Sequence, residues 1–565
     1  MRRPYLHYTD CLLSWLKARP EYLILALFSL LYLPLVHQPL LRTTGDEKVY
    51  VAQAWEMAAR GSWFVQTLAD IPNYYKPPLH YILLRLGFLT FGSSLWAGLW
   101  MNAVALGFAS FWLCRSIRNI FGNLELAQFC GLGLILAPTV FAHFFASQME
   151  IELLALYTLS LVALLHWEQR PHARSWFGLW LLAGLAAWLK SPVHSVLLAL
   201  GLASLGLSSW STCRRQLWFW MAPLCGVLLG SLSILIPLVI DTEAFYRTYI
   251  VRETFAKGAN GIRVWQSVLP NLSYHIWPIA PHLLLGAAAV LMLKPRFQLL
   301  QSPGFKPALA LAIPTFAFFA WHPYRSEIYA LPAIPGVILL AGLLWQSAAG
   351  SWPVLARLMH GISLLSSLLL PGLLLLLRLR FPSIADWWPS GLTLLCIAVF
   401  VLQLIMLVRL LIAKELRPAR DLMLCWGLAL WTIGLAMAAI GKEDRRGLQE
   451  LVRTQAPPKL GFYNLQHFVW SEWALLNLTS GIPIKGLHEA FSLQQWMLDG
   501  GSVIVSDDKE LEQVQGILGT DVSLKRSCWR RWQSHGTHDP QRNPMLAWQR
   551  RDLELLRGCA YVLTL

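Results

Sequence analysis

The sequence predicts an α-helical protein that crosses a membrane many times and ends in a small soluble α/β domain. The chain of 565 residues is 56% hydrophobic and only 14% charged, which is far more apolar than a soluble protein of this length. Apolar stretches of roughly 16–25 residues recur from residue 21 to about 440, and they are long enough to cross a bilayer core. The later residues have mixed charge and short apolar runs. We therefore predict a transmembrane domain at 1–440 and a soluble domain at 441–565.

About thirteen segments are expected to cross the membrane, and they are the stretches 21–40, 95–114, 124–142, 150–167, 175–190, 192–209, 217–240, 276–293, 307–321, 328–347, 354–377, 390–413 and 421–440. The first has no small-residue cleavage site after it, so we expect it to remain as an anchor. Residues 78–91 are also apolar but contain Arg85, and we interpret them as an interfacial helix. Residues 48–60 have a helical rhythm, which predicts an amphipathic helix along the outer surface.

The basic residues predict the orientation. With the N-terminus inside, the predicted inner loops carry repeated basic residues and few acids, which is the positive-inside pattern. These residues are Arg2, Arg3, Lys17, Arg19, Arg115, Arg118, Arg170, Arg174, Arg214, Arg215, Lys294, Arg296, Lys306, Lys414, Arg417 and Arg420. The pattern would reverse if 78–91 crossed the membrane. Thirteen crossings then place the C-terminal domain outside. The net charge of +15 belongs to these loops, so we expect membrane lipids and no nucleic acid as partners.

The tail combines short strand patterns with helical patterns. Strands are expected at 459–463, 482–485 and 502–506, and helices at 488–499 and 508–518, which together indicate a small α/β domain. The tail shows no Gly-rich phosphate loop and no metal-ligand spacing, and a cap or acceptor-docking module is the simplest interpretation. Cys528 and Cys559 are the only cysteines of the tail, and they could pair if it faces an oxidising compartment.

Charged residues gather on the predicted outer side. They lie in Asp46-Glu47, in Tyr74-Tyr75-Lys76-Pro77-Pro78, in Glu150-Ile151-Glu152, in Lys190-Ser191-Pro192 and in Arg325-Ser326-Glu327 with Tyr329. Each site alone has a plain explanation, because a lysine at the end of a span snorkels to the headgroups and a carboxylate there is often only solvated. Their location on one face of the bundle favours a shared functional site.

The chemistry of these groups suits transfer from a lipid phosphate. Cations near the headgroup plane would hold a phosphate and stabilise its charge as it leaves. A carboxylate can take the proton of an incoming hydroxyl or amine. Direct displacement assisted by one carboxylate base would invert the anomeric centre of a transferred sugar.

At these residues the chain resembles the GT-C superfamily of polyprenyl-phosphate-sugar-dependent glycosyltransferases. It is most similar to the branch with the bacterial aminoarabinose transferase of lipid A and the protein O-mannosyltransferases. The similar motifs, in chain order, are Gly45-Asp46-Glu47 with Tyr50, Tyr75-Lys76-Pro77, Glu150 with Leu153, Leu189-Lys190-Ser191-Pro192, and Arg325 to Pro335 with Tyr329. The resemblance covers residues 20–345 and the plan of thirteen spans with a periplasmic α/β tail.

The resemblance implies roles for individual residues. Asp46 would be the catalytic carboxylate, and Glu150 would position the acceptor or the base. The groove for the lipid phosphate would be lined by Lys76, Lys190, Arg325 and Tyr329. Glu47, Tyr50 and Tyr75 would support the site.

Two departures leave the donor sugar open. The aminoarabinose enzyme has an acid where this chain has Tyr75 and a basic residue where it has Val49. Any divalent-cation site that depends on that acid is therefore open as well. His275 remains a possible ligand, although a lone histidine is more often structural. The long sugar-binding insert of the eukaryotic mannosyltransferases is missing, which favours a bacterial enzyme.

Three functions remain as hypotheses. The first is a multi-pass glycosyltransferase of the bacterial inner membrane that moves a sugar from undecaprenyl phosphate on the periplasmic side. Its acceptor would be lipid A, another envelope glycan or a protein, so it would act in lipid A modification or protein mannosylation. The second is a non-catalytic lipid-binding or lipid-flipping protein, and the third is a sensor or scaffold whose tail binds a partner. The charges cluster at one surface and no internal repeat is evident, which favours the first.

Overall fold

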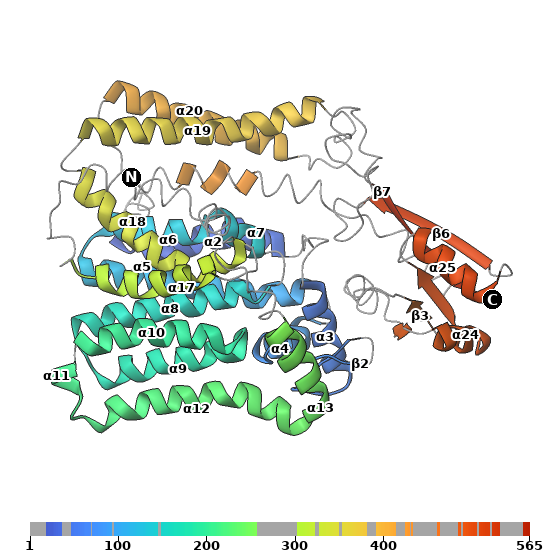
Figure 1. Ribbon diagram of the computed structural model, residues 1–565. Helices are drawn as coiled ribbons and strands as arrows, with labels where there is room; N and C mark the ends of the chain where they lie inside the picture. The colour runs from blue at the N-terminus through green and yellow to red at the C-terminus, as the bar shows by residue number, and fades with distance from the viewer. Residues whose placement is uncertain are drawn as a thin grey trace, which may run out of the picture.

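The computed structural model describes the chain in segments, namely residues 18–36, 47–68, 71–92, 95–144, 148–208, 210–256, 302–321, 327–349, 353–380, 391–413, 424–425, 427–429, 431–432, 460–463, 484–487, 490–505, 508–519, 523–530 and 557–564. Most of the described residues before 440 form a bundle of long helices that lie roughly parallel to one another (Figure 1). The expected span 276–293 lies outside the described residues, so the count of thirteen crossings stays a prediction.

The bundle consists of long apolar helices. They are α2 (Pro20–Val36), α5 (Leu95–Phe121), α6 (Leu124–Ile135), α7 (Pro138–Phe144), α8 (Glu150–Gln169), α9 (Ala173–Leu189), α10 (Pro192–Ser208), α12 (Leu217–Ile240), α17 (Phe305–Trp321), α18 (Ile334–Ala349), α19 (Pro353–Arg380) and α20 (Leu392–Ala413). Among the described residues, five helices are long and apolar enough to span a membrane. The expected span 124–142 is instead two helices, because the chain leaves the helical conformation before Pro138.

Helix α8 lies at the centre of the bundle and α12 at its edge. In its most apolar window 83% of α8 is buried, and α8 packs against α5, α9, α17 and α18. Only 17% of the corresponding window of α12 is buried, and its exposed residues are mainly aliphatic. This contrast is expected when lipid covers the outer helices of a bundle.

Helices α9 and α12 approach each other closely through two glycines. A Cβ atom added to Gly184 would lie 2.7 Å from the carbonyl oxygen of Gly226, and one added to Gly226 would lie 2.5 Å from that of Trp180. Small residues at such a contact let two helix backbones pack directly. The glycines therefore fix the position of α9, whose C-terminal end carries Lys190.

Short elements gather at one end of the bundle (Figure 1). They are α3 (Glu47–Ala59), β1 (Thr67–Leu68), β2 (Ile71–Pro72), α4 (Leu79–Phe91), α13 (Thr242–Phe245) and the π-helix η1 (Tyr246–Ala256). With 13 residues, α4 is about 20 Å long, which is shorter than a hydrocarbon core and agrees with the expected interfacial helix. The helix expected at 48–60 is present, but its surface position was wrong. Residues 50–54 are all buried, because α3 packs against α4.

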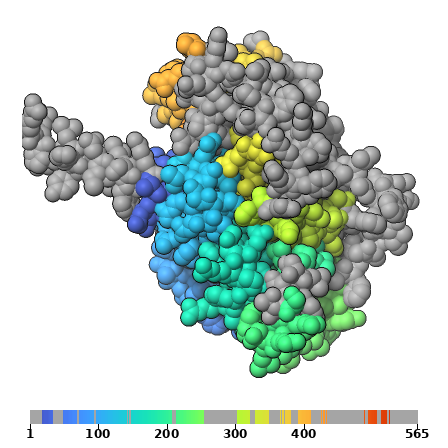
Figure 2. Space-filling model, turned by 90° about the vertical axis from the view of Figure 1, so that its left-hand side faces the viewer, coloured from blue at the N-terminus to red at the C-terminus, as the bar shows by residue number. Residues whose placement is uncertain are grey.

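The opposite end of the bundle carries the short helix α11 (Trp210–Cys213) and faces the viewer in Figure 2. Arg118 near the end of α5, Arg170 after α8, Arg174 in α9 and the pair Arg214-Arg215 after α11 belong to this end. One of them, Arg118, forms a 2.8 Å ion pair with the buried Glu21 of α2. These five of the predicted inner-loop cations thus lie away from the end that holds α3, α4 and η1.

The C-terminal part of the chain forms a mixed five-stranded sheet. Its strands are β3 (Leu460–Tyr463), β4 (Ile484–Leu487), β5 (Ser502–Val505), β6 (Ser523–Arg530) and β7 (Arg557–Thr564), in the order β4-β3-β5-β7-β6. The first three are parallel, and β7 is antiparallel to β5 and to β6. Helices α24 (Ala490–Leu498) and α25 (Asp508–Leu518) pack on the sheet over a core that includes Leu493, Val503 and Val514. The boundary at 440 stays a prediction.

Candidate active site

The candidate site lies at the end of the bundle where α8 begins and α9 ends. It also includes the loop before α4, the π-helix η1 and the 3-10 helix η5 (Glu327–Ala333), which leads into α18. Proline shapes this end of the chain at Pro77-Pro78, Pro192 and Pro332, where it interrupts or begins a helix. These breaks bring polar side chains from distant segments to one end of an apolar bundle.

Glu150 and Lys190 form a buried ion pair. The Lys190 ammonium lies 2.8 Å from Oε1 of Glu150, and the side chains are only 11% and 3% exposed. Lys190 also lies 5.0 Å from the ring centroid of Tyr329, which stacks on Phe319 at 4.8 Å. A cation held against an aromatic face and a carboxylate has a fixed position. The structure therefore brings together three of the residues expected to form the site.

Lys76 forms a second ion pair, with Glu253 of η1. Its ammonium lies 3.1 Å from Oε2 of Glu253, and the two side chains are 18% and 6% exposed. The same ammonium lies 4.4 Å from the ring centroid of Tyr75, and the Tyr75 ring lies 5.9 Å from that of Tyr50. The amide of Gln66 donates a 2.8 Å hydrogen bond to the Lys76 carbonyl. Lys76, Tyr75 and Tyr50 thus form one contact group, as expected.

Helix η1 also binds the residues just before Lys76. The Tyr74 backbone N–H donates to Oγ1 of Thr248 at 3.1 Å, and the Arg252 guanidinium donates to Oδ1 of Asn73 at 2.6 Å. The Tyr74 ring packs on Phe245 with centroids 5.6 Å apart. Burial, and secondarily the charge of Asp241, raises the pKa of Tyr74 to about 12, so its phenol stays neutral at physiological pH.

His80 and Glu152 form a third pair, which sequence reasoning missed. Nδ1 of His80 lies 3.0 Å from Oε1 of Glu152, and the two side chains are 0% and 6% exposed. The His80 ring also meets the edge of the Tyr50 ring at 5.3 Å. Among the described residues, neither Nε2 of His80 nor Oε2 of Glu152 has a hydrogen-bond partner. No local signal separates His80 from a core histidine, because its partner lies 72 residues away.

Ring contacts through Tyr75 and Tyr50 and the first turn of α8 link the three pairs. Lys76 is four residues before His80 in the chain, His80 contacts Glu152, and Glu152 shares the first turn of α8 with Glu150. Glu150 binds Lys190, which contacts Tyr329. The set therefore joins α4, α8, α9 and η5 at one end of the bundle.

Several expected residues lie outside this description. Asp46, His275 and Arg325 are not among the described residues, and Glu47 is placed only as the first residue of α3. Within the described ranges, no group of three or more His, Cys, Asp or Glu side chains is arranged to hold a metal ion. The dependence on a divalent cation therefore stays open.

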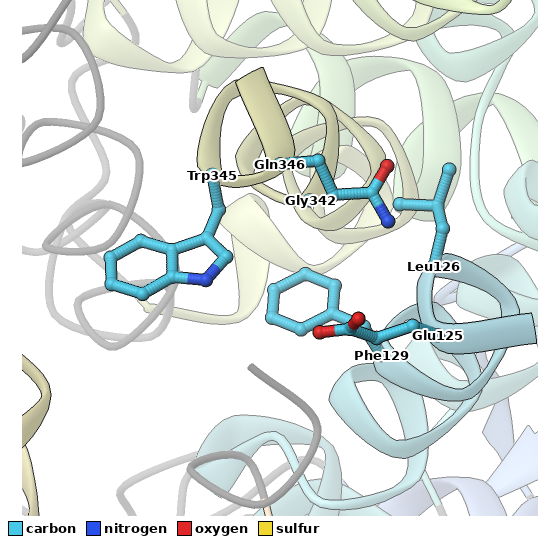
Figure 3. Close-up of a pocket in the computed structure, with 6 residues that line it drawn as sticks. All are labelled: Glu125, Leu126, Phe129, Gly342, Trp345 and Gln346. Atoms are coloured by element: carbon cyan, nitrogen blue, oxygen red, sulfur yellow. The ribbon is translucent and has the colours of Figure 1, made fainter. Parts of the chain in front are cut away.

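A shallow hollow lies away from the site, between α6 and α18 (Figure 3). It is lined by Glu125, Leu126, Phe129, Gly342, Trp345 and Gln346. Because α6 begins near Glu125 and α18 ends near Gln346, the hollow belongs to the opposite end of the bundle. It contains none of the expected site residues.

Comparisons with known proteins agree on the kind of fold. Residues 75–240 match the family described as dolichyl-phosphate-mannose-protein mannosyltransferase, and this range includes Lys76, Glu150 and Lys190. No curated protein sequence matches the chain significantly. Fourteen chains of solved structures match its fold.

Two of these structures are of ArnT from Cupriavidus metallidurans. The crystal structure bound to undecaprenyl phosphate has a TM-score of 0.62 at 18% identity and covers 96% of this chain and 97% of that one. The apo structure has a TM-score of 0.61, also at 18% identity, and covers 95% and 97%. The chain therefore shares the polytopic fold of these ArnT structures, and its residues 75–240 are similar to the mannosyltransferase family.

Proposed function

We propose that this protein transfers a sugar from a polyprenyl phosphate, most simply undecaprenyl phosphate, to an acceptor of the bacterial envelope. The site would face the periplasm, with the N-terminus in the cytoplasm and the C-terminal domain in the periplasm. The acceptor would be lipid A, another envelope glycan or a protein. The ArnT structure, which was solved with undecaprenyl phosphate bound, supports a donor of this lipid class.

The observation that carries this proposal is the set of contacts from Lys76 to Lys190. Two lysines lie at the same end of an apolar bundle, and each is held by a carboxylate that is nearly buried. Burying charged pairs at such a depth costs desolvation free energy. Pairs that are kept there therefore usually have a function. Two fixed cations at the membrane boundary suit the phosphate of a lipid donor better than any neutral ligand.

The proposed reaction uses Asp46 as the base. Asp46 directly precedes α3, which packs against α4 and carries Tyr50 beside Tyr75 and His80. Its carboxylate would take the acceptor proton as the acceptor oxygen or nitrogen attacks the anomeric carbon. The bond from that carbon to the phosphate oxygen would break on the opposite face, so the anomeric configuration would invert. Lys76 and Lys190 would stabilise the phosphate as it leaves.

The test is a comparison of envelope composition. Cells that lack this protein, complemented with the wild type or with Asp46→Asn, are extracted, and their lipids, glycans and proteins are compared by mass spectrometry. We expect the wild type to restore a mass increment of one sugar and Asp46→Asn to fail, although both accumulate in the membrane. An increment that Asp46→Asn restores fully would refute the role of Asp46. The absence of any increment would favour the lipid-binding alternative.

A further inference from the structure

The two cysteines of the C-terminal sheet occupy directly opposite positions in neighbouring strands. Strands β6 and β7 run antiparallel, and their backbone register pairs Cys528 with Cys559. The chain has nine cysteines, and the other seven all lie at or before residue 425. The only two cysteines of the C-terminal part of the chain are therefore direct partners in the sheet.

This register meets the geometric demand of a disulfide. Directly opposite residues of an antiparallel pair have Cα atoms about 4.5–5.5 Å apart. A disulfide usually joins Cα atoms about 4.4–6.8 Å apart. The first range lies within the second, so the backbone register of Cys528 and Cys559 is compatible with a disulfide.

The strand register places Cys559 on the same face of the sheet as Val503 and Val505 of β5. Every second residue of a strand lies on the same face, so Cys559 shares its face with Tyr561 and Leu563. These two residues pair with Val505 and Val503 of β5, which are buried in the core under α24 and α25.

Strand β6 gains most from such a bond. It is an edge strand, with β7 as its only neighbour in the sheet. The connection from Arg530 to Arg557 contains 26 residues (557 − 530 − 1), so closing the pair costs considerable chain entropy. A cross-link near the end of β6 lowers the entropy of the unfolded chain, so less entropy is lost when the two strands pair.

We propose that Cys528 and Cys559 form a disulfide bond in the mature protein. The inference rests on the proposed periplasmic location of the tail, because disulfides form in that compartment. The two thiols lose two protons and two electrons as the S–S bond forms. The electrons pass to the disulfide of a thiol-disulfide oxidoreductase, which is reduced to a dithiol.

The direct test is peptide mapping of the full chain from its native membrane. Cells are quenched in acid, free thiols are blocked with N-ethylmaleimide, and the purified protein is digested with trypsin without reductant. Cleavage after Arg526, Arg530 and Arg557 gives the peptides 527–530 and 558–565. We expect them as one linked species that separates on reduction. Recovery of both peptides only in the maleimide-modified form would overturn the inference.

Thiol counting gives an independent readout. Denatured wild-type protein should react with seven equivalents of a maleimide polymer before reduction and nine after it, since nine cysteines less two are free. The control Cys225→Ser, in α12, should give six and eight. Cys528→Ser and Cys559→Ser should each give eight in both states. Nine equivalents in the unreduced wild type would contradict the proposal.

These results are independent of sugar transfer. A linked peptide in a protein that transfers no sugar would leave the disulfide standing and refute the proposed function. Sugar transfer by a protein whose Cys528 and Cys559 are both free would refute the disulfide and leave the proposed function standing. In cells whose disulfide-forming oxidoreductase is inactive, the linked peptide should be lost, and its persistence there would refute the proposed route of oxidation.

Discussion

At the scale of single residues, His80 connects the loop before α4, which carries Lys76, to the centre of the bundle. Its Nδ1 contacts Glu152 at 3.0 Å, and Glu152 lies in the most buried spanning helix, α8. The pair fixes the first turn of α4, which begins three residues after Lys76. A change at His80 should therefore affect both stability and the position of Lys76.

Substitution of His80 by asparagine or leucine separates these effects. Asn places an N–H donor near the position of the histidine Nδ1, whereas Leu leaves the buried Glu152 carboxylate without that partner. We expect His80→Leu to lower the free energy of unfolding by about 1–3 kcal/mol and to weaken transfer, and His80→Asn to retain most of both. Thermal unfolding in detergent and sugar transfer would be measured together. Equal values for the wild type and His80→Leu would rule out this role.

At the scale of elements, η1 holds the loop before α4 through contacts at Asn73, Tyr74 and Lys76. Glu253 pairs with the Lys76 ammonium, which we propose binds the donor phosphate. A bound phosphate and Glu253 would therefore compete for Lys76, and η1 would have to shift when the donor binds.

Substitution of Glu253 by glutamine tests this competition. Without the carboxylate charge, Lys76 is freer to bind a phosphate, so we expect Glu253→Gln to bind undecaprenyl phosphate severalfold more tightly. Glu243→Gln is the matched control, because Glu243 pairs with Arg247 at the surface, where both side chains are 74% exposed. The affinities would be compared in nanodiscs. Weaker binding by Glu253→Gln would show that Glu253 supports the phosphate site instead.

The contact between α9 and α12 depends on glycine. In Gly226→Ala the new methyl group would lie 2.5 Å from the carbonyl oxygen of Trp180, so the two helices must separate. We expect a loss of about 1–3 kcal/mol in the free energy of unfolding. Gly178→Ala, where no atom lies within 4 Å of the added Cβ, should leave the melting temperature unchanged or raise it. Melting curves of the two variants in detergent test this directly, and a normal melting temperature for Gly226→Ala would contradict the packing.

At the scale of the whole molecule, hydropathy predicts the bundle because a membrane demands long apolar helices with internally satisfied backbones. The predicted stretches at 150–167, 192–209 and 217–240 agree with α8, α10 and α12 within a few residues. Finer features were less predictable. The break before Pro138 and the strand β7 were missed. Strand β6 was missed as well, because Lys525, Arg526 and Arg530 interrupt the apolar pattern of a strand.

The sequence grouped the candidate site residues at one end of the helices but did not predict their contacts. Motif order and topology indicated Lys76, Glu150, Lys190 and Tyr329, and the structure brings the last three together. Glu253 lies 177 residues from Lys76, in the π-helix η1, and no recognisable motif marks it in the sequence. Contacts over such distances depend on how the helices pack, which one sequence does not encode locally.

The two ends of the bundle carry different sets of charged residues. Lys76 and Lys190 lie with carboxylates at one end of the bundle, whereas Arg170, Arg174 and Arg214 lie at the other. Only the first two are expected to contact a donor phosphate. The central claim is therefore that these two lysines bind one phosphate together.

Binding of undecaprenyl phosphate to purified protein in nanodiscs tests this claim most directly. We expect Lys76→Gln and Lys190→Gln each to weaken binding about tenfold, or about 1.4 kcal/mol. The double variant should lose less than the sum of the single losses, because both lysines contact the same group. Arg214→Gln, at the opposite end, should bind as the wild type does. Unchanged affinity in both single variants would contradict the account.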